Sequence, residues 1–382
     1  AKNKVHPALK TIVPSVSAAP GIAEPMENGI HWNFHYPWHH YVSNNKYLDT
    51  TLYYNGQRWH NLNMKWYETG VAYNAMDSLD GLPNPQFRER LLHPTYDTYW
   101  QHMMPYKEEF AHINIPVLAT TGYYDGGQVG TQYYLKEHTK YNTNAEHYLV
   151  IGPYTHFGAQ EKPSSHIFGY DVDPVAQIDI LELIFEWFDH ILKGKTKPAL
   201  LKDKINYQVM GANTWGHASS LQSMANDTLR YYLCNRRSGV TFESLFGTGN
   251  HGKDEHYTLS KQPVNPNDYL EQAIDFTDRS NLTWNSSGWR TIVGDSLMVG
   301  GGLSFVTEPF ESDFELNGSF GGEISVSINK MDFDYTVVVF EQTPDGNFFA
   351  LTLPYKARAS FAHSLERRQL LTPCEKTKLP FG

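Results

Sequence analysis

The sequence has few cysteines, no excess of basic residues and no long apolar run. Its two cysteines, Cys234 and Cys374, lie far apart, and no C-x-x-C pair occurs in the 382 residues. Neither a disulfide framework nor a cysteine zinc motif is therefore expected. Lys and Arg total 31 against 41 Asp and Glu, and without a basic stripe the chain is not expected to bind nucleic acid. No apolar run reaches the roughly 18 residues of a membrane-spanning helix, so no membrane segment is expected.

The residues that are present suit folded domains. With 40% hydrophobic and 19% charged residues, the chain can bury a core and lacks the composition of a disordered protein. Its length is enough for two or three domains. We find no internal repeat and no low-complexity tract, so the domains are expected to differ from one another.

Clean alternation of strand and helix patterns marks residues 113–195 as an α/β domain. Residues 115–121 form a continuous β-rich run, as buried parallel strands do, and residues 146–151 form a second one. A helix pattern lies between them. A long amphipathic helix follows, with Asp173 as its expected N-cap residue and Gly194 at the position of a C-cap glycine.

The flanking segments show two other patterns. Residues 1–26 hold a strand-like run and are assigned to the same α/β domain. Residues 27–112 are crowded with Trp, Tyr and His, and their short, weakly periodic stretches predict a helical cap. Residues 202–382 show short alternating runs separated by turns, which predicts an all-β sandwich or jelly roll. The predicted fold class is thus α/β, followed by an all-β domain.

A carboxylate and an imidazole follow the two buried strands. Asp125 comes just past the first strand in Gly122-Tyr-Tyr-Asp125, and His156 has the matching place past the second in Gly152-Pro-Tyr-Thr-His156. Open α/β sheets keep their catalytic residues at the carboxyl ends of neighbouring strands. In a Ser-Asp-His triad the acid orients the imidazole, which takes the serine proton, and the acid precedes the histidine in the chain. We therefore expect the Asp125 carboxylate to lie within hydrogen-bond reach of the His156 ring.

Each of these residues also has a purely structural interpretation. An aspartate after a strand is often a turn residue or a helix N-cap. A single histidine in a chain with 18 of them is more often structural or exposed than catalytic. The order and the matching positions together favour a hydrolase site over two unrelated residues.

The two motifs resemble the family of X-Pro dipeptidyl-peptidases, cocaine esterases and α-amino-acid ester hydrolases (CocE/NonD), which includes glutaryl-aminocephalosporanate acylases. Gly122-Tyr-Tyr-Asp125 is similar to the Gly-Trp-Tyr-Asp acid motif of that family, and Gly152-Pro-Tyr-Thr-His156 to its Gly-Pro-Trp-x-His motif. Further likenesses are spread along the chain, at residues 187–194, 209–215, 305–309 and 332–334. The resemblance implies the C-terminal part of an α/β-hydrolase domain with a helical cap, followed by a jelly roll.

The same resemblance implies a function. It points to a serine hydrolase that cleaves an ester or amide acyl bond, with Asp125 and His156 as catalytic residues, no cofactor, no metal, and a periplasmic or secreted location. Its substrate would be a small acyl compound or a peptide, and an assembly of identical subunits is compatible with the sequence. A second interpretation is a non-catalytic protein whose jelly roll binds a carbohydrate or another protein, since a fold alone does not give a function.

The sequence contains no G-x-S-x-G motif, in which the nucleophile of such hydrolases lies. Residues 6–14 resemble the family segment that follows the nucleophile. The resemblance therefore places the serine upstream of residue 1, and we expect residues 1–382 alone to be inactive. Gly126, Gly127 and Gln128 stand where α-amino-acid ester hydrolases have extra carboxylates, which leaves the acyl specificity open.

Aromatic residues near the predicted site are candidates for substrate binding. Tyr123 and Tyr124 precede Asp125, and Trp32 and Trp38 belong to an aromatic stretch of the cap. Packing in the core is an equally good interpretation of each. The same stretch carries four histidines at spacings that resemble metal ligands, but Pro37 is expected to interrupt that helix and no cysteine completes a set. These histidines are His31, His35, His39 and His40.

Overall fold

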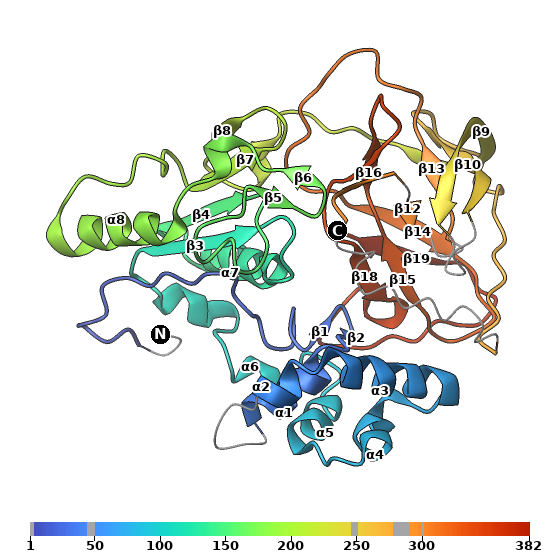
Figure 1. The fold of residues 1–382 in the computed structure, drawn as a ribbon, viewed down its shortest axis with the longest axis horizontal. Coiled ribbons are helices and arrows are strands. Elements are labelled where there is room, and N and C mark those ends of the chain that lie inside the picture. Colours follow the sequence, from blue (N-terminus) through green and yellow to red (C-terminus); the bar gives the residue numbers. More distant parts are fainter. Residues whose placement is uncertain (1–3, 44–49, 246–250, 278–290, 296, 299–301) are drawn as a thin grey trace.

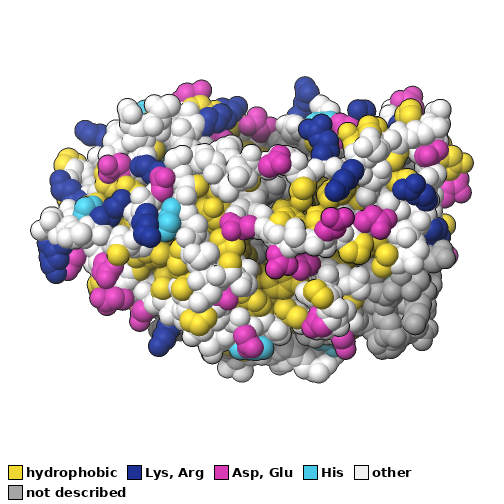
Figure 2. Space-filling model, turned by 90° about the horizontal axis from the view of Figure 1, so that it is seen from above, with side chains coloured by type: hydrophobic (Ala, Val, Ile, Leu, Met, Phe, Trp, Pro, Cys, Tyr) yellow, Lys and Arg dark blue, Asp and Glu magenta, His cyan; other side chains and the backbone are white. Residues whose placement is uncertain are grey.

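The computed structural model describes residues 4–43, 50–245, 251–277, 291–295, 297–298 and 302–382. Figure 1 shows the α/β part at the left, a group of helices at the bottom, and a region of β-strands at the right. None of the helices in the described ranges is long and apolar enough to cross a membrane. Figure 2 shows one face, on which Lys and Arg side chains are scattered among acidic ones.

The α/β part is built on a four-stranded sheet in the order β3-β4-β7-β8. The first three strands run parallel and the last is antiparallel. Every residue of β3 is buried, and all but one residue of β4, as expected for a parallel strand that is covered on both faces. The strands are β3 (Val117–Gly122), β4 (His147–Gly152), β7 (Ile205–Val209) and β8 (Thr214–Ala218).

The sheet continues past residue 202, where the sequence pattern suggested that the β domain begins. Strand β7 pairs in parallel with β4 through Leu149 and Ile205, so it extends the α/β sheet. On the other side of the sheet, residues 9–14 were predicted to form a strand. This segment lies beside β3 through isolated bridges from Ile12 to Val117 and from Ser15 to Thr120.

Two long helices accompany the sheet, α7 (Gly127–Tyr141) and α8 (Ile180–Lys193). The predicted C-cap of α8 is confirmed, because Gly194 has a left-handed φ of 68°. The predicted N-cap is wrong. The helix begins after Asp179, whose side chain accepts a hydrogen bond from the Glu182 N–H. The Asp173 carboxylate instead accepts from Gln208 Nε2 at 2.8 Å and from the Gly211 N–H at 2.9 Å, so it is not available to cap a helix.

The cap is helical, as predicted, and most of its helices are short, although α3 (Gly56–Thr69) is as long as α8. Pro37 does not interrupt the first of them, because it lies in the first turn, where a backbone N–H has no partner within the helix. The elements are β1 (Met26–Glu27), β2 (Ile30–His31), α1 (His35–Ser43), α2 (Thr50–Tyr53), α3 (Gly56–Thr69), η1 (Tyr73–Ala75), α4 (Met76–Asp80), α5 (Pro85–Leu91), α6 (Thr98–Gln101) and η2 (Lys107–His112).

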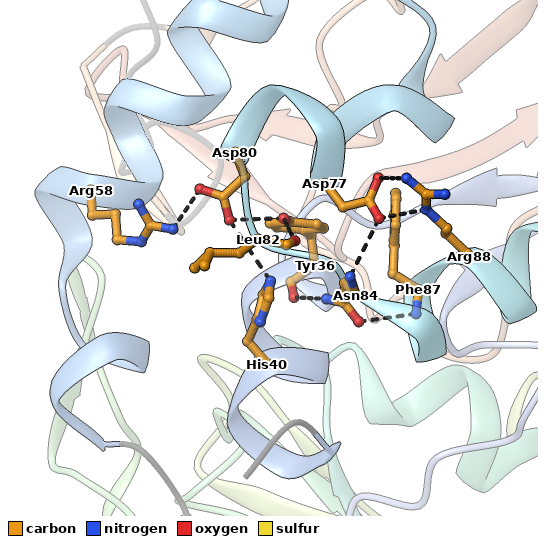
Figure 3. A network of polar contacts seen from close by, with 9 residues as sticks. All are labelled: Tyr36, His40, Arg58, Asp77, Asp80, Leu82, Asn84, Phe87 and Arg88. Carbon is orange, nitrogen blue, oxygen red and sulfur yellow. Dashed lines mark hydrogen bonds and ion pairs between the residues drawn. The ribbon is translucent and has the colours of Figure 1, made fainter.

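Two buried carboxylates of α4 join the cap helices to one another (Figure 3). Asp80 accepts a hydrogen bond from the Tyr36 hydroxyl at 2.8 Å and pairs with Arg58. Asp77 accepts two hydrogen bonds from Arg88. Burial alone would raise the pKa of Asp77, but the Arg88 hydrogen bonds hold it below its ordinary value. Both charges are thus partnered, as buried charges must be, and they fix the packing of α1, α3 and α5 around α4.

The β region consists of several small sheets within the described ranges. Its longest pair is the antiparallel β9 and β10. The described strands form sheets in the orders β12-β9-β10-β13, β11-β17-β16, β14-β19 and β15-β18, and the predicted jelly roll stays a prediction.

The remaining elements complete the chain. They are β5 (His166–Ile167), β6 (Tyr170–Asp171), η3 (Pro174–Ala176), η4 (Gln222–Met224), β9 (Tyr232–Leu245), β10 (His251–Ser260), β11 (Val293–Gly294), β12 (Leu297–Met298), β13 (Phe305–Val306), β14 (Gly322–Val326), β15 (Asp334–Val337), β16 (Phe340–Gln342), β17 (Phe348–Ala350), β18 (Tyr355–Arg358), η6 (Ala359–Phe361) and β19 (Thr377–Phe381).

Candidate active site

The ends of β3 and β4 are held against each other by their backbones. Gly122 and Gly152 are partners in the parallel register, and the Tyr123 N–H donates to the Gly152 carbonyl at 2.9 Å. A Cβ atom on Gly122 would lie 1.9 Å from the Tyr154 carbonyl oxygen. Because no side chain fits in that space, glycine at this position lets the loop after β4 cross closely over the end of β3.

This close approach brings together the two residues that the sequence pattern singled out. His156 Nδ1 lies 2.9 Å from Asp125 Oδ1, so the predicted contact is confirmed. The Asp125 side chain is 3% exposed, whereas that of His156 is 56% exposed. The acid is therefore enclosed by protein, while the imidazole reaches the surface.

The hydrogen bond fixes which ring nitrogen of His156 carries the proton. An ionised carboxylate only accepts, so Nδ1 must be the donor, and the neutral ring then has its lone pair on Nε2. Within the described part of the chain, no residue forms a hydrogen bond with Nε2. The hydrogen bond from Asp125 raises the pKa of His156, against the opposing effect of burial. This is the arrangement of an oriented general base whose protonated form is stabilised.

The hydroxyl groups of Tyr123 and Tyr124 are both engaged in hydrogen bonds to backbone carbonyl groups. The Tyr123 hydroxyl donates to the Gln208 carbonyl at 2.9 Å, and the Tyr124 hydroxyl donates to the Ala350 carbonyl at 2.7 Å. Tyr124 is 8% exposed. Both hydroxyls are thus used to join the end of β3 to later parts of the chain, which gives these tyrosines a packing role and does not support the predicted contact with substrate.

Trp32 and Trp38 lie in the cap and share no described contact with Asp125 or His156. The Lys356 ammonium lies 4.0 Å from the centre of a Trp32 ring. Trp38 makes an edge contact with Tyr53 at 5.6 Å between ring centres. Both side chains are half-buried. Their proposed place at the substrate therefore has no support from these contacts and stays a prediction.

Of the four cap histidines, His35, His39 and His40 are buried and His31 is half-buried. His35 is 4% exposed and His39 is 1% exposed. Burial lowers the pKa of His35 to about 2 and that of His39 to about 3, so both rings are neutral at pH 7. In the described ranges, no three side chains of the metal-ligating types converge.

Sequence reasoning missed one residue beside the imidazole. Phe157 is 73% exposed, and its ring meets the His156 ring edge-on, with 5.6 Å between centres. A single exposed aromatic side chain does not by itself mark a binding surface, so the contact with His156 is what makes Phe157 a candidate. The signal that could have found it is its place immediately after the histidine.

Comparisons with known proteins identify the families that this chain resembles. Residues 1–158 match the model of the X-Pro dipeptidyl-peptidase (S15) family. Among curated proteins, the cocaine esterase of Rhodococcus sp. (strain MB1 Bresler) is 26% identical over 264 residues, which are 68% of this chain and 43% of the esterase.

Two solved structures share the fold. An aminopeptidase from a marine sediment Thaumarchaeota archaeon superposes with a TM-score of 0.67 at 16% identity, over 98% of this chain and 62% of that protein. An α-amino acid ester hydrolase gives a TM-score of 0.64 at 17% identity, over 100% of this chain and 63% of that enzyme. The chain thus has the fold of these α/β hydrolases and spans less than two thirds of the length of each relative.

Proposed function

We propose that the protein is a serine hydrolase of the X-Pro dipeptidyl-peptidase (S15) type, whose family model matches residues 1–158, and that it cleaves an ester or amide acyl bond. The observation that carries the proposal is the 2.9 Å contact between Asp125 Oδ1 and His156 Nδ1. It leaves Nε2 of an exposed imidazole with its lone pair available as a general base.

The proposed reaction follows a two-step acyl-enzyme route. His156 Nε2 takes the proton of a serine hydroxyl as the serine oxygen attacks the acyl carbon, and it then gives this proton to the leaving group. In the second step the same nitrogen takes a proton from water as the water oxygen attacks the acyl carbon, and it then gives this proton to the serine oxygen, which releases the acid product and the free serine. Asp125 keeps Nδ1 protonated and stabilises the imidazolium in both steps. Because no G-x-S-x-G occurs in residues 1–382, we propose that the serine lies outside this sequence.

A fluorophosphonate probe tests the proposal directly on the polypeptide that the whole gene encodes. Such a probe phosphonylates a serine that is activated by a histidine base. We expect one serine to be labelled, with the site identified by mass spectrometry, and we expect labelling to be lost in His156→Ala. A protein that remains folded, takes no label and binds glycans instead would show that the β region acts as a binding module, and the hydrolase proposal would be wrong.

A further inference from the structure

The second carboxylate oxygen of Asp125 is held separately from the first. Asp125 Oδ1 faces His156, while Oδ2 lies 3.2 Å from the Thr121 hydroxyl. Thr121 is the last residue but one of β3 and is fully buried. Among the residues that the structure describes, Thr121 Oγ1 is the one donor that reaches Oδ2. A hydroxyl has a single proton to donate, and the Thr121 hydroxyl donates it to the Asp125 carboxylate.

The backbone at Gly127 also limits the space around Oδ2. A Cβ atom on Gly127 would lie 2.7 Å from Asp125 Oδ2 and 2.7 Å from the Val16 carbonyl oxygen. Gly127 is the first residue of α7, so the carboxylate lies beside the positive end of a long helix. Oδ2 is thus enclosed between the Thr121 hydroxyl and the start of this helix, in a space that a side chain at position 127 would fill.

From these contacts we infer that Thr121 is a positioning residue of the site: its hydroxyl fixes the rotation of the Asp125 carboxylate so that Oδ1 points at His156 Nδ1. That this contact matters for catalysis rests on the proposed function. A buried carboxylate oxygen without a donor is costly. When Thr121 does not satisfy Oδ2, the carboxylate turns to find another donor, and the contact between Oδ1 and His156 is populated less.

The strand supplies a matched control at the preceding position. Thr120 is also fully buried, and its hydroxyl lies 2.7 Å from both Ser15 Oγ and the Ala159 carbonyl oxygen. Successive side chains of a strand point to opposite faces. Thr120→Val therefore removes a buried hydroxyl from the same strand without touching Asp125, which separates positioning from a general loss of stability.

We would measure His156 by NMR in residues 1–382, because this readout needs no turnover and no nucleophile. In Thr121→Val we expect the downfield resonance of the His156 Nδ1–H to be lost or broadened and the pKa of His156 to fall. Thr121→Ser keeps the hydroxyl and should restore both signals. Thr120→Val should leave both as in the wild type.

An unchanged His156 resonance and pKa in folded Thr121→Val would overturn the inference, as would equal changes in Thr120→Val. Should Thr121→Val fail to fold, Gly127→Ala provides a second variant. Its methyl group would displace Oδ2, so the same loss of the Nδ1–H signal is expected, and an unchanged signal would contradict the inference. The outcome is independent of whether the fluorophosphonate experiment labels a serine, so the two proposals can fail separately.

Discussion

Replacement of His156 with alanine is expected to lower kcat/KM for a p-nitrophenyl ester by at least about 10³-fold in the polypeptide that the whole gene encodes. The loss follows because the serine would lack the general base that the Asp125 carboxylate orients, and the leaving group would lack the protonated imidazole that acts as its general acid. Asp125→Asn should cause a loss of comparable size, because an amide favours the wrong ring tautomer and does not stabilise the imidazolium. The measurement is the initial rate of nitrophenolate release at several substrate concentrations.

A second histidine–aspartate pair provides the control for this experiment. His166 Nδ1 lies 2.7 Å from Asp171 Oδ1, but both side chains are exposed, at 59% and 94%. This pair has the same atoms in contact as Asp125 and His156, but its carboxylate is exposed to solvent, whereas that of Asp125 is buried. His166→Ala should therefore change kcat/KM by less than about twofold, the scale of an ordinary surface substitution. Equal losses in His156→Ala and His166→Ala would mean that the Asp125–His156 pair has no special role.

Acidification from pH 7 to pH 5 is expected to destabilise the cap through its buried histidines. His39 faces Arg90, His31 and His40, and all of these neighbours disfavour a proton on its ring. Burial is the larger cause and lowers the pKa of His39 to about 3, from an ordinary value of 6.5. His35 is shifted in the same direction, to about 2, beside Glu24 and Arg90.

The direction in which pH changes the free energy of unfolding follows from proton linkage. Below pH 6.5 the unfolded chain binds a proton at each of these histidines and the folded chain does not, so the free energy of unfolding falls with pH until the folded pKa is reached. At pH 5 each such histidine costs about 2 kcal/mol. Glu27 acts in the opposite direction over this range, because burial raises its pKa to about 7. Variants that differ at one histidine therefore give a cleaner test than the wild type alone.

Urea unfolding at pH 7 and pH 5 provides the measurement. In His39→Leu, the loss of unfolding free energy between the two pH values should be smaller than in the wild type by about 2 kcal/mol. His166→Gln replaces an exposed ring outside the cap and serves as the control variant. An identical pH dependence in the wild type and His39→Leu would show that His39 is protonated in the folded state or titrates with an ordinary pKa.

Local sequence patterns predicted that Asp125 and His156 follow the ends of two buried strands. Buried parallel strands show as continuous apolar runs, and the residue after such a strand has a defined place at the sheet edge. For that reason Asp125 and His156 could be placed next to each other before the fold was known. The Thr121 contact could not be foreseen, because a buried threonine in a strand carries the same local signal whether its hydroxyl faces a carboxylate or a carbonyl group.

Several residues form contacts that their local pattern does not indicate, because their partners lie far away in the sequence. Asp173 has the pattern of an N-cap, but Gln208 and the Gly211 N–H take its carboxylate. Tyr123 and Tyr124 lie next to the catalytic candidate in sequence, yet their hydroxyls bind carbonyl groups 85 and 226 residues away. Likewise, the alternating pattern of β7 suits an antiparallel sheet, and its parallel pairing with β4 is set by tertiary packing.

The pKa of His156 tests most directly whether Asp125 and His156 act as one acid–base unit. It can be read from the ring proton shifts of residues 1–382 during a pH titration, in the wild type and in Asp125→Asn. We predict a value above the ordinary 6.5 in the wild type, because Asp125 stabilises the charged ring. In Asp125→Asn only burial remains, so the value should fall below 6.5. The same pKa in both proteins would contradict the account.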